Sequence, residues 1–183
     1  YLSHEGFIVV VSDFPGHGTS LYQFEQGYFG KGNALDTLVE DIQRLRHIIT
    51  KRYEDLPYFM LGVDLGSLVL LKYAGVYGDY INGMILLGTC MKNSFYYRMK
   101  MIVDFNILLH GQMNHSRVIK KAIDLFLQRN LNGNYKMTNT KEVNLYMEDP
   151  LTDFVYTNQA YRDILDYIKY TSDEEHLKQI PQY

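Results

Sequence analysis

Two short apolar runs with a helix-like segment between them constrain the fold of this chain more than any other feature. Residues 58–61 and 84–87 have the length and apolar character of strands. Residues 68–77 are apolar almost all round, which is typical of a buried helix. Because the connections between the three segments are short, the order predicts a βαβ unit with two parallel strands in one sheet.

A further strand and helix are predicted upstream. Residues 7–11 form an unbroken apolar, β-branched run, which is typical of a strand buried on both faces of a parallel sheet. Apolar residues then recur every three or four positions from Leu35 to Ile49, which predicts an amphipathic helix of about five turns. The sequence therefore predicts two consecutive βαβ units and an α/β fold class.

After residue 90 the pattern becomes helical. Residues 96–110 and 116–130 are rich in Met, Ile and Leu and predict two helices. Thr157 is expected to cap a further helix that carries apolar residues from Ala160 to Ile168. The sequence Ser172-Asp173-Glu174-Glu175 has the spacing of a capping box and predicts one more short helix.

These patterns divide the chain into three parts. Residues 1–90 are expected to form a partial α/β core, residues 91–175 a helical insertion that covers it as a lid, and residues 176–183 the start of a return to the core. The sequence begins at Tyr1 without an initiator Met and stops at Tyr183. We therefore expect the chain to be the central part of a larger domain.

Composition excludes several classes of protein. With 18 Lys and Arg against 21 Asp and Glu, a net charge of −3 and no basic run, the chain is not expected to bind nucleic acid electrostatically. No apolar run reaches the roughly 18–20 residues of a transmembrane segment. The single cysteine, Cys90, excludes an internal disulfide and suits a cytoplasmic location. The histidine spacing fits no metal site, we expect no cofactor, and the oligomeric state is left open.

The residues that carry chemistry lie between the first strand of the central unit and its helix. Gly62-Val63-Asp64-Leu65-Gly66-Ser67 fits the Gly-x-nucleophile-x-Gly pattern of a nucleophile elbow. We expect strained backbone at Asp64, and glycines at 62 and 66 because a Cβ there would collide with neighbouring backbone. The backbone N–H of Leu65 is expected to point where an oxyanion would form.

Together with three other segments, this motif resembles the α/β-hydrolase superfamily. Its closest branch comprises the monoacylglycerol lipases and bacterial lysophospholipases, which are related to serine aminopeptidases. These three segments are residues 13–20, 27–30 and 83–89, and further matches are residues 55–57, residues 77–79, and Asp149-Pro150 followed by Phe154 and Thr157. The resemblance covers nearly the whole chain and implies hydrolysis of carboxylic esters of lipids, with a small apolar or lipid-ester substrate. It also implies that Asp13 is a structural member of its loop.

The chain departs from the family at the decisive residue. The family's elbow reads Gly-His-Ser-Met-Gly, whereas this one has Val63, Asp64 and Leu65 at its centre. A serine esterase needs a hydroxyl that a histidine can deprotonate, which Asp64 lacks, and Ser67 is three residues into the helix. The resemblance further implies that the acid and base follow strands beyond Tyr183. Ordinary serine-esterase chemistry is therefore not expected.

Three interpretations of Asp64 stay open. Its carboxylate can cap the following helix in a relative that has lost catalysis and binds an apolar ligand or a partner protein. It can be a nucleophile, as in the haloalkane dehalogenases and epoxide hydrolases that share this fold, attacking an sp3 carbon to form an ester that water then cleaves. It can also be a local anomaly in a protein that still counts as a hydrolase.

Candidate ligand-binding residues lie in the first loop and in the expected lid. His17 follows the carboxyl end of a predicted strand, where open α/β sheets bind ligands, although the resemblance favours a loop-shaping role over a base. Met99 and Ile102 belong to a set of apolar residues that either line a channel for an acyl chain or pack the lid onto the core. The other members of that set are Met101, Leu108, Leu109, Leu125, Phe126 and Leu127.

Overall fold

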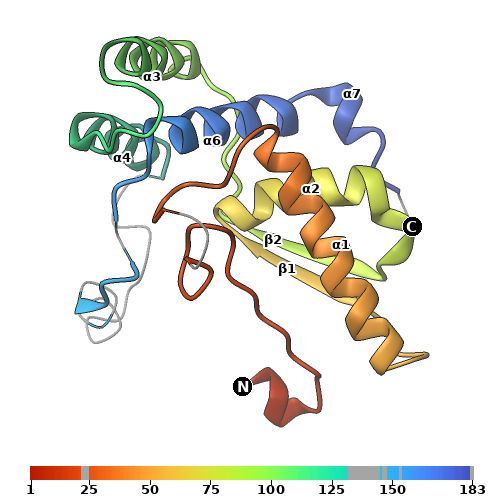
Figure 1. The fold of residues 1–183 in the computed structure, drawn as a ribbon. Helices are drawn as coiled ribbons and strands as arrows, with labels where there is room; N and C mark the ends of the chain where they lie inside the picture. Colours follow the sequence, from red (N-terminus) through yellow and green to blue (C-terminus); the bar gives the residue numbers. More distant parts are fainter. Residues whose placement is uncertain (22–24, 132–144, 146–147, 153, 182–183) are drawn as a thin grey trace.

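The structure is a computed structural model that describes residues 1–21, 25–131, 145, 148–152 and 154–181 (Figure 1). Its two strands are β1 (Phe59–Val63) and β2 (Gly83–Leu87). The α-helices of the described part are α1 (Ala34–Arg52), α2 (Leu65–Tyr77), α3 (Tyr96–His110), α4 (Arg117–Leu131), α6 (Asn158–Thr171) and α7 (Glu174–Leu177). Short 3-10 helices span Leu2–Glu5 and Gly78–Tyr80. No described helix is both long and apolar enough to cross a bilayer.

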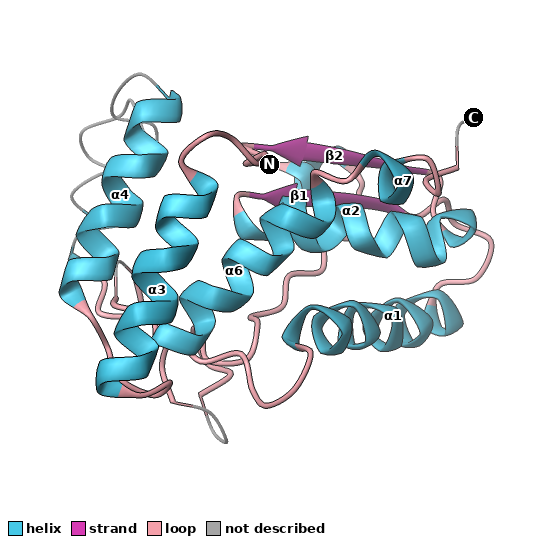
Figure 2. Cartoon of the chain, turned by 90° about the horizontal axis from the view of Figure 1, so that it is seen from above, coloured by secondary structure: helices cyan, strands magenta, loops and turns pink. Residues whose placement is uncertain are grey.

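The central βαβ unit is present as predicted. β1 and β2 run parallel, with Phe59 opposite Gly83 and Val63 opposite Leu87, and α2 connects them. Figure 2 shows α1 and α2 on the same side of the two strands. Side chains of β1 alternate accordingly: Met60 is buried on the helix side, whereas Leu61 and its neighbours on the other face are exposed. The described sheet is therefore covered on one face.

The prediction of a strand at residues 7–11 is wrong. These residues form no strand, and the exposed fraction of their side chains runs from 42% at Val10 to 88% at Val11. A strand is held by ladder hydrogen bonds from a neighbour, and no described segment pairs with these residues. Only the second of the two predicted βαβ units is consequently observed.

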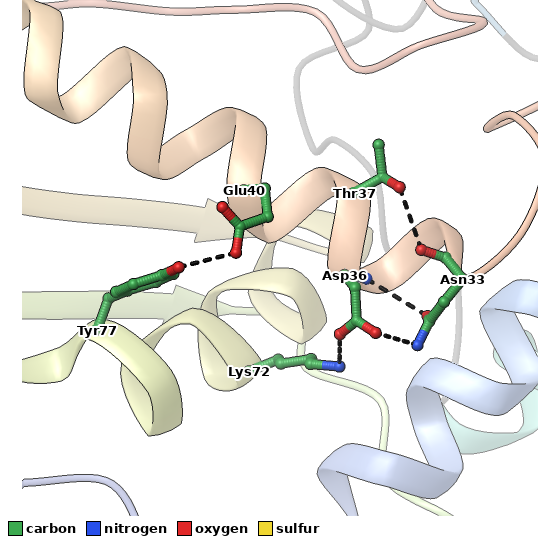
Figure 3. Close-up of polar contacts among 6 residues, drawn as sticks. All are labelled: Asn33, Asp36, Thr37, Glu40, Lys72 and Tyr77. Carbon is green, nitrogen blue, oxygen red and sulfur yellow. Dashed lines mark hydrogen bonds and ion pairs between the residues drawn. The ribbon is translucent and has the colours of Figure 1, made fainter.

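Polar contacts join α1 to α2 along their shared side (Figure 3). Lys72 on α2 forms an ion pair with Asp36 on α1, and its ammonium lies 4.6 Å from the centre of the Tyr170 ring on α6. Five residues further along α2, the Tyr77 hydroxyl donates to the Glu40 carboxylate at 2.8 Å. Lys72 thus links α2 to two other helices, α1 and α6, through one side chain.

The N-terminus of α1 is fixed by Asn33. Its side-chain oxygen accepts a hydrogen bond from the backbone N–H of Asp36 at 3.4 Å, and its carbonyl accepts from the Thr37 hydroxyl at 3.2 Å (Figure 3). The first contact satisfies a backbone N–H that has no partner within the helix itself. The helix begins at Ala34 for this reason, one residue before the predicted apolar stripe.

Helix α6 lies within the residues predicted to form the lid and contacts both α3 and α2. Its predicted N-cap is confirmed, since the Thr157 hydroxyl accepts from the backbone N–H of Ala160 at 3.2 Å. The predicted Ser172 capping box is wrong: Asp173 caps α7 by accepting from Glu175, while the Ser172 hydroxyl donates to the Ile168 carbonyl at 2.6 Å. Ser172 therefore ends α6 instead of beginning α7.

A buried carboxyl group lies on α6. Asp163 is only 7% exposed; one of its oxygens accepts from the Gln159 amide at 2.8 Å, and the other has no hydrogen-bond partner among the described residues. Burial raises the pKa of Asp163 to about 6, the nearby Asp166 adds to the rise, and the Gln159 hydrogen bond opposes it. The ionised form is thus disfavoured in the folded chain.

This burial predicts a pH-dependent stability. Because the folded pKa of Asp163 exceeds its unfolded value, the folded chain holds the proton more tightly, and the free energy of unfolding falls as the pH rises from about 4 to about 6. Asp163→Asn removes this loss and should be more stable than the wild type by roughly 1–2 kcal/mol at pH 7. Urea unfolding at pH 4.5 and pH 7 measures the difference.

The matched control is Asp41→Asn on α1, at a carboxyl side chain that is 46% exposed and does not contribute to the raised pKa of Asp163. We expect its stability to follow that of the wild type with pH to within about 0.5 kcal/mol. Equal pH dependence in Asp163→Asn and the wild type would contradict the role given to Asp163.

Candidate functional site

The chain turns from β1 into α2 through one residue. β1 ends at Val63, α2 begins at Leu65, and Asp64 between them has φ 49° and ψ −115°. A positive φ is uncommon for a residue with a side chain, and strain of this kind costs about 1–3 kcal/mol. The strained backbone that the sequence predicts at Asp64 is therefore confirmed.

The end of β2 fixes this turn. The backbone N–H of Asp64 donates to the Leu87 carbonyl at 2.9 Å, which extends the β1–β2 pairing one residue past the strands. Gly88 follows with φ +68°, and a Cβ at that position would lie 2.7 Å from the Asp64 carboxylate. Sequence reasoning did not assign Gly88 to the site; the signal available was a glycine directly after a buried strand.

The two glycines of the motif differ in what they do. A Cβ on Gly62 would lie 2.7 Å from the backbone oxygen of Gly66, so any side chain there requires the turn to open. A Cβ on Gly66 would meet nothing within 4 Å. The predicted collision is therefore confirmed for Gly62 and wrong for Gly66, because the first turn of α2 leaves open space beside Gly66.

The Asp64 carboxylate does not cap α2. Its side chain makes no capping hydrogen bond, and the residue is exposed. A side chain caps a helix from extended backbone, as at Thr157 (φ −64°, ψ 155°), and the positive φ of Asp64 takes it out of that geometry. The side-chain cap that the first interpretation predicts is thus wrong, the loss of catalysis in that interpretation stays a prediction, and the carboxylate is left at the apex of the turn.

The Ser67 side chain is hydrogen-bonded to the backbone. It is fully buried, and its hydroxyl donates to the carbonyl of Asp64 at 2.6 Å, next to its own N–H at 3.0 Å from the same oxygen. A buried hydroxyl in this position does not face the apex of the turn.

The N–H of Leu65, as the first residue of α2, has no acceptor within its own helix.

His17 lies in an aromatic cluster. Its ring stacks on Phe29 with centroids 5.4 Å apart and meets Phe154 edge-on at 5.3 Å. Nδ1 is 3.1 Å from the Pro15 carbonyl, which requires a proton on Nδ1, so Nε2 accepts from the Tyr156 hydroxyl at 2.9 Å. Burial lowers the pKa of His17. Both ring nitrogens are therefore occupied by the protein.

Asp13 organises the same loop. Its carboxylate accepts from the backbone N–H of Thr19 at 2.9 Å and from the Thr19 hydroxyl at 3.0 Å. The Thr19 backbone hydrogen bond holds the pKa of Asp13 below its usual value. The loop that carries His17 is thus closed on itself by a carboxylate.

Sequence reasoning did not single out Tyr156 and Phe29 for this cluster. The available signals were the aromatic loop at residues 27–30 and the aromatic residues that follow Asp149-Pro150. The segments are also joined by backbone, since the Thr157 N–H donates to the Gly27 carbonyl at 3.0 Å.

The two ligand candidates on α3 are placed differently. Met99 is 5% exposed and belongs to the hydrophobic core, whereas Ile102 is 41% exposed. No hydrogen bond joins Asp64, His17 or either of these residues to one another in the described part of the chain. The side chains of Phe126 and Leu127 lie outside the described residues.

Comparison with known proteins identifies the family to which the chain belongs. The whole chain, residues 1–183, matches the family described as serine aminopeptidase, S33. A protein phosphatase methylesterase 1 from Candida albicans (strain SC5314 / ATCC MYA-2876) is 31% identical over 88 residues, which is 48% of this chain and 22% of that protein.

Two solved structures share the fold. A thermostable carboxyl esterase from Bacillus coagulans aligns with a TM-score of 0.72 at 22% identity, over 92% of this chain and 57% of the esterase. A monoacylglycerol lipase from Paleococcus ferrophilus aligns with a TM-score of 0.61 at 18% identity, over 92% of this chain and 56% of the lipase. The chain therefore has an α/β-hydrolase fold and spans little more than half the length of these proteins.

Proposed function

The chain belongs to the serine aminopeptidase S33 family of α/β-hydrolases, and from that premise we propose that it binds a small apolar or lipid ester without cleaving it by a serine mechanism. The observation that carries the proposal is the residue at the apex of the turn. Asp64 has the strained backbone of an elbow nucleophile but no hydroxyl, and the nearby Ser67 hydroxyl is buried and bound to backbone.

The ligand class is inferred from the relatives. The two structures that share the fold are named as a carboxyl esterase and a monoacylglycerol lipase, and the matching curated protein is named as a methylesterase. All three names refer to carboxylic esters. The assignment of residues 91–175 as a lid over such a ligand stays a prediction.

Replacement of Asp64 by serine tests the proposal. In the complete protein, wild type should hydrolyse p-nitrophenyl butyrate no faster than Asp64→Ala, and Asp64→Ser should exceed both by about tenfold or more, because it restores the missing hydroxyl. Covalent labelling by a fluorophosphonate should occur in Asp64→Ser alone. Wild-type hydrolysis that Asp64→Ala abolishes would sink the proposal.

A second candidate function rests on a specific observation. The Asp64 carboxylate is exposed and has no hydrogen-bond partner among the described residues, so it is available as a nucleophile. A carboxylate needs no base to activate it. One oxygen would attack an sp3 carbon, the halide or epoxide oxygen would leave with the bonding electrons, and water would then cleave the alkyl ester and restore the carboxylate.

Intact-mass spectrometry separates this candidate from the first. After incubation with 1,2-epoxyhexane, an alkyl ester mapped to Asp64 supports the nucleophile, and Asp64→Asn should then carry none. Asp13→Asn is the matched control. Because the Asp13 carboxylate is hydrogen-bonded to Thr19, it should not react, and this variant should carry the same adduct on Asp64 as the wild type.

A further inference from the structure

His115 lies where three segments of the chain meet. It belongs to the connection between α3 and α4, and its backbone forms an isolated antiparallel bridge with Thr157, the residue before α6. The backbone N–H of Asn158 donates to the Asn114 carbonyl at 2.9 Å, and the Thr157 N–H donates to the Gly27 carbonyl at 3.0 Å. Backbone contacts therefore hold His115 beside the segment before α6 (residues 154–157), which is itself joined to the loop before α1.

Both ring nitrogens of His115 face oxygens that can only accept a hydrogen bond. Nδ1 lies 2.7 Å from the Val155 carbonyl oxygen, and Nε2 lies 3.0 Å from a carboxylate oxygen of Glu25, in the loop before α1. A neutral imidazole carries one N–H, so it can donate to one of these oxygens and turns a lone pair toward the other. A protonated ring carries two N–H groups and donates to both. The geometry therefore fits the charged form of His115.

His17 contacts the same segment in a different way. Its Nε2 lies 2.9 Å from the Tyr156 hydroxyl, which can donate, so a neutral ring satisfies this contact. Burial also lowers the pKa of His17, which favours the neutral form. The adjacent residues Val155 and Tyr156 are thus held by two histidines, one of which fits its contacts when charged and the other when neutral.

One carboxylate balances the charge of His115. Among the described residues, Glu25 forms an ion pair with its ring, and the two side chains are 52% and 33% exposed. The segment before α6 offers a carbonyl and no charged side chain, and the charged residues of α6 itself begin at Arg162. Residues 111–116 contain no other titratable side chain, and Arg117, the first residue of α4, is exposed.

We propose that His115 is a pH-sensitive clasp between the loop before α1 and the segment before α6. At low pH the charged ring donates to Glu25 and Val155 together and holds the two segments closed. When the ring loses one proton, two lone pairs face each other at one of these contacts, and that contact opens. Histidine is the side chain whose charge ordinarily changes between pH 5 and 8. The proposal does not depend on whether Asp64 performs chemistry.

Hydrogen exchange of the Thr157 amide, followed by NMR, tests the proposal in the complete protein. This N–H donates to Gly27, so it is protected only while the two segments stay together. Its protection factor, corrected for the intrinsic pH dependence of exchange, should fall at least about fivefold from pH 5.5 to pH 8.0 in the wild type. In His115→Gln it should fall by less than about twofold. The Val69 amide, in the buried helix α2, is the reference for global unfolding.

Glu25→Gln separates a clasp from a simple ion pair. The introduced side-chain amide can donate to Nε2 of a neutral ring while the Nδ1 proton is donated to Val155, so protection at pH 8.0 should be at least about threefold greater than in the wild type. Protection no greater than in the wild type at that pH would contradict the clasp.

The matched control is His47→Gln on α1, which changes an exposed histidine outside the clasp and should follow the wild type at both pH values. A wild-type protection factor that does not change between pH 5.5 and pH 8.0, or an equal fall in His115→Gln, would overturn the proposal.

Discussion

Replacement of Gly62 by alanine is expected to lower the free energy of unfolding by about 3 kcal/mol. The new Cβ would lie 2.7 Å from the Gly66 carbonyl oxygen and 2.8 Å from the Gly66 carbonyl carbon. Both are backbone atoms of the first turn of α2, so neither can rotate away as a side chain would. The turn must open or α2 must shift from β1. Urea unfolding followed by circular dichroism measures the loss.

Gly66→Ala provides the control within the same motif. A Cβ at this position meets nothing within 4 Å, and alanine favours a helix over glycine by up to about 1 kcal/mol. The variant should therefore be as stable as the wild type or slightly more stable. Equal destabilisation by both substitutions would show that the close contact at Gly62 does not determine the turn.

Replacement of Phe29 by alanine is expected to cost about 3–5 kcal/mol, the second large effect. Phe29 is 1% exposed, stacks on His17, and lies 5.9 Å from the Tyr156 ring and 6.1 Å from the Tyr167 ring. Its removal leaves a cavity between the first loop, the segment before α6, and α6 itself. Thermal unfolding followed by circular dichroism measures the change in stability.

The control for Phe29 is the same substitution at an exposed site. Phe105 is 61% exposed, so Phe105→Ala should change the free energy of unfolding by less than about 1 kcal/mol. A loss at Phe29 no larger than the loss at Phe105 would contradict the central place given to the aromatic cluster.

Local pattern was sufficient for the elements that form by themselves or with a sequence neighbour. The predicted helix at residues 96–110 coincides with α3, and the helix predicted at 116–130 differs from α4 by one residue at each end. The strands predicted at 58–61 and 84–87 correspond to β1 and β2. Helical periodicity and the short βαβ connection are properties of adjacent residues, which is why they can be read from the sequence.

Residues 7–11 show where local pattern fails. Their composition favours a strand, but a strand also needs a hydrogen-bonding neighbour, and the identity of that neighbour is not written in the run itself. At Ser172 the failure is smaller and has a different cause. The Ser172 hydroxyl and the Asp173 carboxylate are adjacent in sequence, and either could cap the short helix. The Ser172 hydroxyl instead donates to the last turn of α6, which leaves Asp173 as the cap.

The backbone conformation of the candidate site was predictable from the sequence, but the direction of its side chains was not. A strand, two glycines and a helix were enough to expect strain at Asp64, which the structure has. The direction of its carboxylate was not predictable, because a capping side chain and an apical one differ in φ and ψ at a single residue. The cluster around His17 depends on Tyr156, which is 139 residues away in sequence.

The position of α6 has a mechanical consequence. Lys100 on α3 lies 3.7 Å from Asp166 on α6, and Arg162 on α6 lies 3.4 Å from Asp104 on α3, while Lys72 on α2 sits over the Tyr170 ring of α6. Helix α6 is thus clamped between α3 and α2. A displacement of α3 would therefore strain ion pairs and a ring contact that continue through α6 to the helix that begins beside Asp64.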